Sequence, residues 1–385
     1  MNTENYLICF KLPILILKTF GFWKEEPWSK LRWMYSILIR YLFLDCIVIA
    51  YSVHLIKSLG IRSIADISTT LSYLLTIYGL FFKSMWIIIK QKKIRSMMKS
   101  LEELLKVTSF GKTNERNLMQ HENNRMMKVE RIFYGSSIVL AFFVLIKAIA
   151  FDSRIGKIPL DTWIFFNMEP NSFLYWLVVA QECFATLFVI IVNFSLDMIQ
   201  IVFMHYLTVM LKELSIEIES IQPEDDTKDY DRFCKCVDCF VQLKDLGGEI
   251  STHLSLTFFV QAILSSVILC TSAFLLSTLS FTNEMPIIIR TVIYGISMMI
   301  QIFLPCYYGN ELTLISNKIS TTLFHSKWLD GSKKYKKAVT IFMENAKRSI
   351  NISAFGFVFV DIGTLTTILN STYSLYALVS KLNTK

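Results

Sequence analysis

The stretch FLYWLVVAQECFATLFVIIVNFSLDMIQIVF, residues 173–203, is predominantly apolar and contains only two charged residues, Glu182 and Asp197. A helix needs about 20 mostly apolar residues to cross the hydrocarbon core of a bilayer. A membrane-spanning β-strand would instead show about ten residues of alternating polarity, and this stretch does not alternate. Residues 173–203 are therefore predicted to form a membrane-spanning helix.

Six further stretches of the 385-residue chain have the same character, which gives seven predicted spans. The other six are residues 33–56, 67–89, 132–151, 254–281, 286–308 and 352–379. The composition, with 53% hydrophobic residues and only 13 Gly, excludes a collagen-like, low-complexity or Gly-rich protein. We predict an all-α membrane protein with seven transmembrane helices and helical cytosolic extensions. Residues 6–17 are expected to form a short interfacial or buried helix, because Lys11 and Pro13 interrupt a signal-peptide pattern.

The basic residues predict the orientation, because cytosolic segments of membrane proteins carry an excess of Lys and Arg. With the N-terminus in the cytosol, 29 of the 39 Lys and Arg lie on inner segments, 6 on outer segments and 4 within spans. The N-terminus is therefore expected inside and the C-terminus outside, the reverse of a G-protein-coupled receptor. This bias also accounts for the net charge of +8, so no nucleic-acid partner is needed.

The spans and inner segments divide the chain into five expected parts. These are an N-terminal helix with transmembrane helices 1–4 (1–204), cytosolic anchor helices (205–253), transmembrane helices 5 and 6 (254–308), further anchor helices (309–351), and a last, pore-lining helix (352–385). Both anchor segments carry apolar residues at helical spacing. The repeats are Leu207, Leu211, Leu214, Ile218 and Ile221; Phe233, Val237, Phe240, Leu243, Leu246 and Ile250; and Ala338, Val339, Phe342, Ala346 and Ile350. Two interpretations stay open: these helices pack only within the chain, or they hold several subunits together.

No catalytic motif occurs in the sequence, and the five His are scattered singly. Cys234, Cys236 and Cys239 lack the matched C-x-x-C pairs of a zinc site, so reduced, partly packed thiols are expected. The sequence therefore predicts neither an enzyme nor a cofactor. Lys83 and Asp197 are expected to lie near the inner membrane interface, with their charged ends reaching water.

The last predicted span is unusually polar and reads DIGTLTTILNSTYSLYALV over residues 361–379. Such a helix is expected to face other helices or water instead of lipid. At 100° per residue, one stripe contains Tyr373, Tyr376 and Ser380. A second and more polar stripe contains Gly363, Thr367, Asn370, Ser374 and Lys381. This polar stripe is expected to pack against the fifth and sixth spans.

The end of the chain resembles that of the insect odorant receptors. The resemblance lies in TYSLYALVSKL (372–382), in Asp361 eleven residues before its Thr, and in seven spans with an inner N-terminus. The related gustatory receptors carry T-Y, five apolar residues and Q-F. Here Val379-Ser380 stands in place of Q-F, which favours an odorant receptor over the gustatory-type alternative. The short loop 205–253 differs from the much longer loop of the obligate co-receptor and favours a ligand-tuning subunit.

This resemblance implies a subunit of a ligand-gated, non-selective cation channel in the plasma membrane of olfactory sensory neurons. Its expected partners are a small volatile odorant, the shared co-receptor in a heterotetramer, membrane lipid and permeant cations. The last helix of each subunit would line the pore, and the cytosolic helices would form the anchor. The expected pore and gate residues are Tyr373, Tyr376, Val379 and Ser380. A metabotropic seven-helix receptor is disfavoured by the inverted charge bias, and a transporter by the absence of matching Gly/Pro-interrupted repeats.

By the same resemblance, the odorant would bind in the outer half of the second, third, fourth and sixth spans. Such a pocket should be apolar and aromatic, with few polar groups. The residues of that type at that depth are Tyr73, Ile77, Tyr78, Phe142, Leu145, Ile149, Trp176, Ala180, Cys183, Phe184, Tyr294 and Met298.

Overall fold

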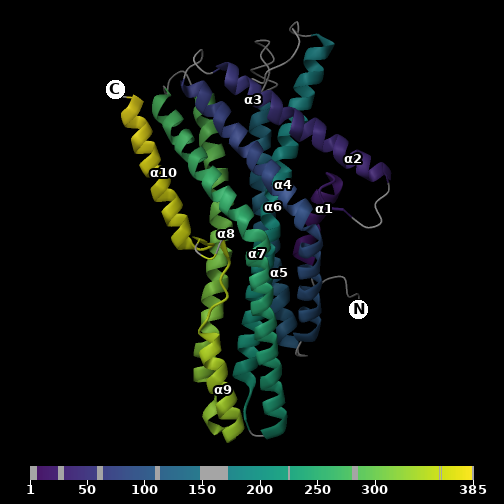
Figure 1. Cartoon of the computed structure of the whole chain (residues 1–385), viewed down its shortest axis with the longest axis vertical. Coiled ribbons are helices and arrows are strands. Elements are labelled where there is room, and N and C mark those ends of the chain that lie inside the picture. Colours follow the sequence, from purple (N-terminus) through teal and green to yellow (C-terminus); the bar gives the residue numbers. More distant parts are fainter. Residues whose placement is uncertain are drawn as a thin grey trace.

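Long helices run side by side along the molecule (Figure 1). The computed structural model describes residues 7–24, 30–58, 64–108, 113–147, 172–223, 226–279, 285–354, 356 and 358–383. The first predicted span consists of α2 (Lys30–Arg40), the π-helical turn η3 (Tyr41–Asp45) and α3 (Cys46–Ser58). The other six spans correspond to α4 (Ile64–Thr108), α5 (Thr113–Lys147), α6 (Phe173–Ser220), α7 (Asp226–Thr278), α8 (Met285–His325) and α10 (Ile362–Asn383).

Five of these segments are apolar and long enough to cross a membrane within the described residues. They are Met34–Lys57, Ile67–Lys106, Phe173–Ser220, Thr227–Thr278 and Ile287–His325. Four helices, α4, α6, α7 and α8, contain 45, 48, 53 and 41 residues. At 1.5 Å per residue they are about 60–80 Å long, twice the thickness of the hydrocarbon core. They therefore extend well beyond the membrane, as the apolar repeats of 205–253 and 309–351 predict.

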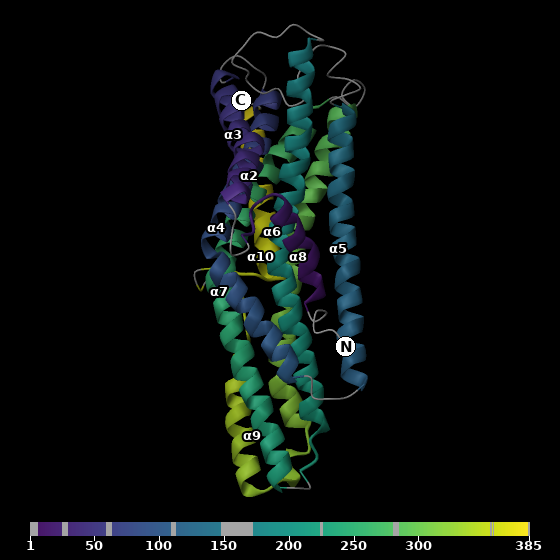
Figure 2. The same cartoon turned by 90° about the vertical axis from the view of Figure 1, so that its right-hand side faces the viewer.

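The extended ends of α6, α7 and α8 form a helical bundle with α9 (Lys333–Ala346), which lies at the end of the molecule opposite the C-terminus (Figures 1 and 2). The apolar repeats pack against one another inside this bundle. Phe342 of α9 contacts Phe233 and Phe240 of α7, with ring centroids 5.8 and 5.3 Å apart. Leu207, Leu211, Leu214, Ile218 and Ile221 are all buried. Packing within the chain thus accounts for these stripes, and their role in holding subunits together stays a prediction.

The short helix α1 (Lys11–Thr19) follows a 3-10 turn, η2 (Ile8–Phe10), and both lie against α6. The ring of Phe10 contacts the rings of Phe203 and Tyr206 at centroid distances of 4.8 and 5.8 Å. The Cys9 amide donates to the Tyr206 hydroxyl at 3.3 Å. The prediction of a short helix near the N-terminus is confirmed. One face of α1, with Pro13 and Leu17, is buried, whereas Leu12 and Leu15 are exposed, so the choice between an interfacial and a buried helix stays a prediction.

The last span begins ten residues later than predicted. Residues 352–361 instead contain a small antiparallel hairpin of β1 (Ser353–Ala354) and β2 (Val358–Phe359). The Ser251 hydroxyl of α7 holds this hairpin, because it donates to the Ser353 carbonyl at 2.8 Å and accepts from the Ser353 amide at 2.9 Å. Asp361 then caps α10, where its Oδ1 accepts from the Thr364 amide at 2.7 Å.

A buried ion pair joins α4 to α6. Lys83 Nζ lies 2.6 Å from Asp197 Oδ1 and donates to Asn193 Oδ1 at 2.8 Å. The two charged side chains are only 1% and 8% exposed. The expectation that Lys83 and Asp197 reach water at the inner interface is therefore wrong. Neighbouring helices enclose both side chains, and the two opposite charges are in direct contact through Asp197 Oδ1.

Removing one partner of this pair is expected to destabilise the fold strongly, because it leaves an uncompensated buried charge. Lys83→Met or Asp197→Leu alone should cost about 3–5 kcal/mol, whereas the double variant should recover most of that loss. Thermal melting of the detergent-solubilised protein, followed by size-exclusion chromatography, measures the three midpoints. If the melting midpoint of the double variant falls by the sum of the two single decreases, the ion pair is not the cause of the lost stability.

Candidate ligand cavity and pore helix

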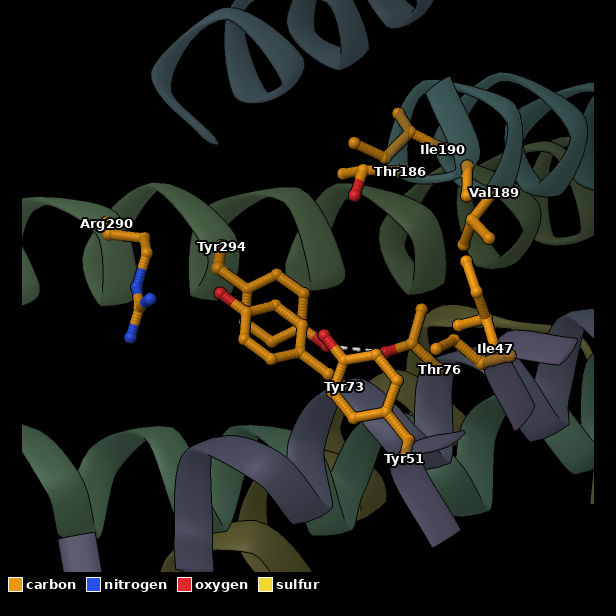
Figure 3. A pocket seen from close by; sticks show the side chains of 11 residues that line it. Ile47, Tyr51, Tyr73, Thr76, Thr186, Val189, Ile190, Arg290 and Tyr294 are labelled. Carbon is orange, nitrogen blue, oxygen red and sulfur yellow. Dashed lines mark hydrogen bonds between the residues drawn. The ribbon is translucent and has the colours of Figure 1, made fainter. Parts of the chain in front are cut away.

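A cavity of about 610 Å³, including its mouth, lies between α3, α4, α6 and α8. Its lining comes from two residues of α3, three of α4, four of α6 and two of α8: Ile47, Tyr51, Tyr73, Thr76, Ile77, Ala185, Thr186, Val189, Ile190, Arg290 and Tyr294. Figure 3 shows the rings of Tyr51, Tyr73 and Tyr294 gathered together, with Thr186 and Val189 on another side. The cavity is therefore aromatic and aliphatic, as a volatile, poorly soluble ligand requires.

Three of the hydroxyl groups around the cavity, those of Thr76, Thr186 and Tyr294, are engaged by the protein itself. Tyr294 donates to the Ser72 carbonyl at 3.2 Å and also lies within hydrogen-bond distance of the Thr76 hydroxyl (Figure 3). The Thr186 hydroxyl donates to the Glu182 carbonyl at 2.9 Å. A ligand that entered here would be held mainly by apolar and aromatic contacts, because these hydroxyls already have partners.

Arg290 supplies the one charged side chain of the lining, and Figure 3 places it at one end of the cavity. Its guanidinium lies 5.7 Å from the centroid of the Tyr73 ring. The Tyr73 ring in turn contacts Tyr294, with centroids 5.6 Å apart and planes inclined by 51°. Cation–aromatic and aromatic–aromatic contacts thus order this wall of the cavity.

Three of the twelve residues predicted to bind ligand, Tyr73, Ile77 and Tyr294, line the cavity. Met298 is buried in a small cluster with Tyr294 and Ile268. The other described candidates do not line it: Tyr78, Phe142, Trp176, Ala180 and Phe184 are exposed on the single chain, and Cys183 is half-buried. The side chain of Leu145, and Ile149 altogether, lie outside the described residues. The ligand-binding role of all twelve stays a prediction.

Some of the other lining residues could have been predicted from the sequence, and some could not. On α4, Thr76 follows Tyr73 by three residues, so helical spacing alone places it on the same face. On α6, the lining runs from Ala185 to Ile190, directly after the predicted candidates at 176–184. The contribution of α3 through Ile47 and Tyr51 carries no sequence signal, because it depends on how the first span packs across α4 and α6.

The helix α10 has two different faces. Leu365, Ile368 and Leu369 pack on the hydrophobic core, and the Thr372 hydroxyl lies 3.4 Å from the Ser266 carbonyl of α7. The opposite face is exposed on the single chain and carries the whole predicted polar stripe: Gly363, Thr367, Asn370, Ser374 and Lys381. The expectation that this polar stripe packs against the fifth and sixth spans is wrong, because the apolar face takes that place.

The four predicted pore and gate residues lie on the last three turns of α10. Tyr373 is 71% exposed, whereas Tyr376, Val379 and Ser380 are half-buried. Tyr376 and Val379 follow Thr372 by four and seven residues, so they continue the stripe that faces α7. The structure of the single chain does not test their role as a gate.

The cysteines of α7 form no metal centre. Cys236 and Cys239 are buried, and burial raises the pKa of both thiols to about 12, which keeps them protonated and unreactive at neutral pH. Within the part of the chain that the structure describes, no three His, Cys, Asp or Glu side chains are grouped to hold a metal ion.

Comparison with known proteins identifies the family. The family model for the seven-transmembrane odorant receptor matches residues 63–373. The chain belongs to the insect odorant receptors. The odorant receptors of this family are membrane receptors and not enzymes, which agrees with the sequence prediction.

Individual relatives of this odorant receptor are distant in sequence. Odorant receptor 46a, isoform B, of Drosophila melanogaster is 22% identical over 398 residues, covering 100% of both chains. Odorant receptor 94a of the same species is 24% identical over 224 residues, so this chain spans only 58% of that relative. The solved structure of olfactory receptor OR5 from Machilis hrabei has a TM-score of 0.77 at 18% identity and covers 98% of this chain and 99% of its own. A structure of OR5 in complex with eugenol matches with the same TM-score. These likenesses confirm the seven-helix membrane fold.

A larger side chain at Ala185 is expected to reduce the response of this receptor to its odorant. Ala185 is fully buried and lines the cavity, so Ala185→Leu would fill part of the ligand space. Overpacking of about 1–3 kcal/mol should raise the half-maximal odorant concentration by about tenfold. The matched control is Leu177→Phe, which enlarges an exposed side chain on the same helix outside the cavity. Concentration–response curves, corrected for surface expression, decide the point, and equal shifts in the two variants would contradict the assignment of the cavity.

Proposed function

We propose that this chain is the odorant-tuning subunit of a ligand-gated, non-selective cation channel, in which it assembles with the shared co-receptor as a heterotetramer. A small volatile odorant binds in the cavity between α3, α4, α6 and α8, and the last helix of each subunit lines a common pore. The N-terminus lies in the cytosol and the C-terminus outside. The extended ends of α6, α7 and α8, with α9, form the cytosolic anchor.

The observation that carries the channel proposal is the exposed polar face of α10. A helix at membrane depth that exposes threonine, asparagine and serine to lipid would be poorly placed, since polar groups in hydrocarbon are costly. A water-filled pore at the centre of an assembly gives that face a favourable environment. The bias of basic residues supports the orientation.

The path from the cavity to the pore runs through α8 and α7. Tyr294 of α8 lines the cavity, and α10 packs against both α7 and α8. A ligand that binds more tightly when α8 is in the position of the open state would raise the population of open channels. The ligand needs no contact with α10 itself, because the packed helices transmit the change.

The eugenol bound to OR5 of Machilis hrabei supports a small volatile as the ligand class. In this chain the cavity would accept a molecule with a ring or alkyl chain, since its lining is mostly aromatic and aliphatic and the hydroxyls of Tyr294 and Thr186 are already hydrogen-bonded. We propose Tyr73, Ile77 and Tyr294 as ligand contacts. Tyr373, Tyr376, Val379 and Ser380 remain the proposed gate of this subunit.

Expression of this chain alone and with the co-receptor tests the proposed assembly. A panel of volatiles should evoke a fast cation current only when both subunits are present, with a reversal potential near zero in mixed Na⁺ and K⁺. Surface labelling of an epitope at the C-terminus of unpermeabilised cells checks the orientation. A second-messenger response in place of a fast current would contradict the channel proposal, and a current without the co-receptor would contradict the dependence on it.

Cysteine substitution tests whether the polar face of α10 faces the pore. In complexes with the co-receptor, Asn370→Cys and Ser374→Cys should become sensitive to a charged methanethiosulfonate reagent applied from outside, with a loss of more than half of the odorant-evoked current. Leu365→Cys, on the buried face, should be insensitive. The wild-type complex controls for native cysteines. Modification of Leu365→Cys alone, with no effect at Asn370 and Ser374, would reverse the proposed orientation of α10.

A further inference from the structure

The segment of α4 that follows its apolar half is strongly basic. Residues 90–99 read KQKKIRSMMK and contain five basic residues and no acidic residue. The second predicted span ends at residue 89 and the fifth begins at residue 254, so this segment and His253 of α7 lie at the same membrane–water boundary. No acidic side chain of the described residues forms an ion pair with Lys90, Lys92, Lys93 or Lys99. These charges are therefore available to a ligand.

One face of this segment forms a shared site with α7. The Trp86 indole N–H donates to the His253 carbonyl at 2.7 Å and joins the two helices at this level. Lys90 Nζ lies 5.2 Å from the centroid of the Trp86 ring. Lys93 is exposed one turn further along the same face. A tryptophan under two lysines at the boundary of the membrane is an arrangement typical of headgroup contacts.

His253 belongs to the same site. Its Nδ1 is buried without a hydrogen-bond partner in the described chain. Desolvation lowers the pKa of His253, and the positive charges of Lys90 and Lys93 lower it further. Glu249, one turn earlier on α7, is the acidic group that faces His253 and acts in the opposite direction. Positive potential dominates this side of the α4–α7 junction.

We propose that Lys90 and Lys93 of α4, with Trp86 and His253, bind the phosphate-containing headgroup of an anionic phospholipid of the inner leaflet. The two ammonium groups would pair with the headgroup charge, and the Trp86 ring would lie against the glycerol and upper acyl region. The lipid would bridge α4, which lines the odorant cavity at its other end, to α7, against which α10 packs. This site goes beyond the proposed odorant cavity and depends on the proposed orientation only for the choice of leaflet.

The chain offers a matched control on the same helix. Lys92 and Lys99 are exposed, carry the same charge and lie about 180–200° around α4 from Lys90. General attraction to a charged membrane depends on the number of basic residues, so it falls equally in Lys90→Gln/Lys93→Gln and in Lys92→Gln/Lys99→Gln. A defined site on the α7 side falls only in the first pair.

The full-length chain in a neutral maltoside detergent is titrated with a short-chain, fluorescent phosphatidylserine, and its phosphatidylcholine analogue serves as the neutral probe. The wild type and Lys92→Gln/Lys99→Gln should prefer phosphatidylserine, and Lys90→Gln/Lys93→Gln should bind it about tenfold more weakly. Lys90→Arg/Lys93→Arg should retain binding, which separates loss of charge from loss of fold. Each variant is used only as a monodisperse species on size-exclusion chromatography.

Three outcomes would overturn the proposal. Equal loss in both Gln pairs would show a general basic band instead of a site. Equal affinity of the wild type for the two lipids would remove the headgroup charge from the recognition. Displacement of the lipid by inorganic phosphate at the same concentration would identify a site for free phosphate and not for a membrane lipid.

Discussion

The ion pair between Lys83 and Asp197 is the constraint on which the arrangement of the bundle depends. A lysine and an aspartate buried at membrane depth are tolerated only when each satisfies the other, and Asn193 supplies a further acceptor. The pair fixes α4 against α6, the most deeply buried helix of the molecule. The cavity proposed for the odorant lies next to it, because Ile77 precedes Lys83 by less than two turns of α4 and Ile190 lies about two turns before Asp197 on α6. The ion pair thus holds α4 and α6 together next to the cavity.

The helix α4 carries three features along its length: part of the cavity lining, the buried ion pair and the basic segment. Its first turns line the cavity through Tyr73, its middle carries Lys83, and Trp86 joins it to α7 one turn further. Lys90 and Lys93 then carry the basic site at the membrane boundary. A displacement of α4 caused by the odorant would therefore reach α7 and, through α7, the last helix. The same connection would let the lipid composition of the inner leaflet change the ease of opening.

The sequence predicts the architecture well because a membrane span leaves a strong and continuous signal. The seven spans and the long helices that extend beyond them follow from apolar runs and helical repeats. The sequence does not predict features that depend on contacts between residues far apart in the chain. Lys83 and Asp197 are 114 residues apart, so their pairing left no local trace. The hairpin after Ile352 is largely apolar, so the sequence predicts it as part of the last span. The cavity is lined by side chains from four helices. The sequence predicts only those lining residues whose type and depth in a span are recognisable, such as Tyr73 and Tyr294.

The last helix brings these features together, because its apolar face packs on α7 and α8 and its polar face is left exposed. The proposed assembly with a central pore would place both faces of α10 in a favourable environment. The most direct test is an electron cryomicroscopy structure of this chain with the co-receptor, bound to an activating odorant. The account predicts odorant density beside Tyr73 and Tyr294, and Asn370 and Ser374 facing a water-filled axis. Odorant density at another place, or a polar face of α10 directed at lipid, would contradict it.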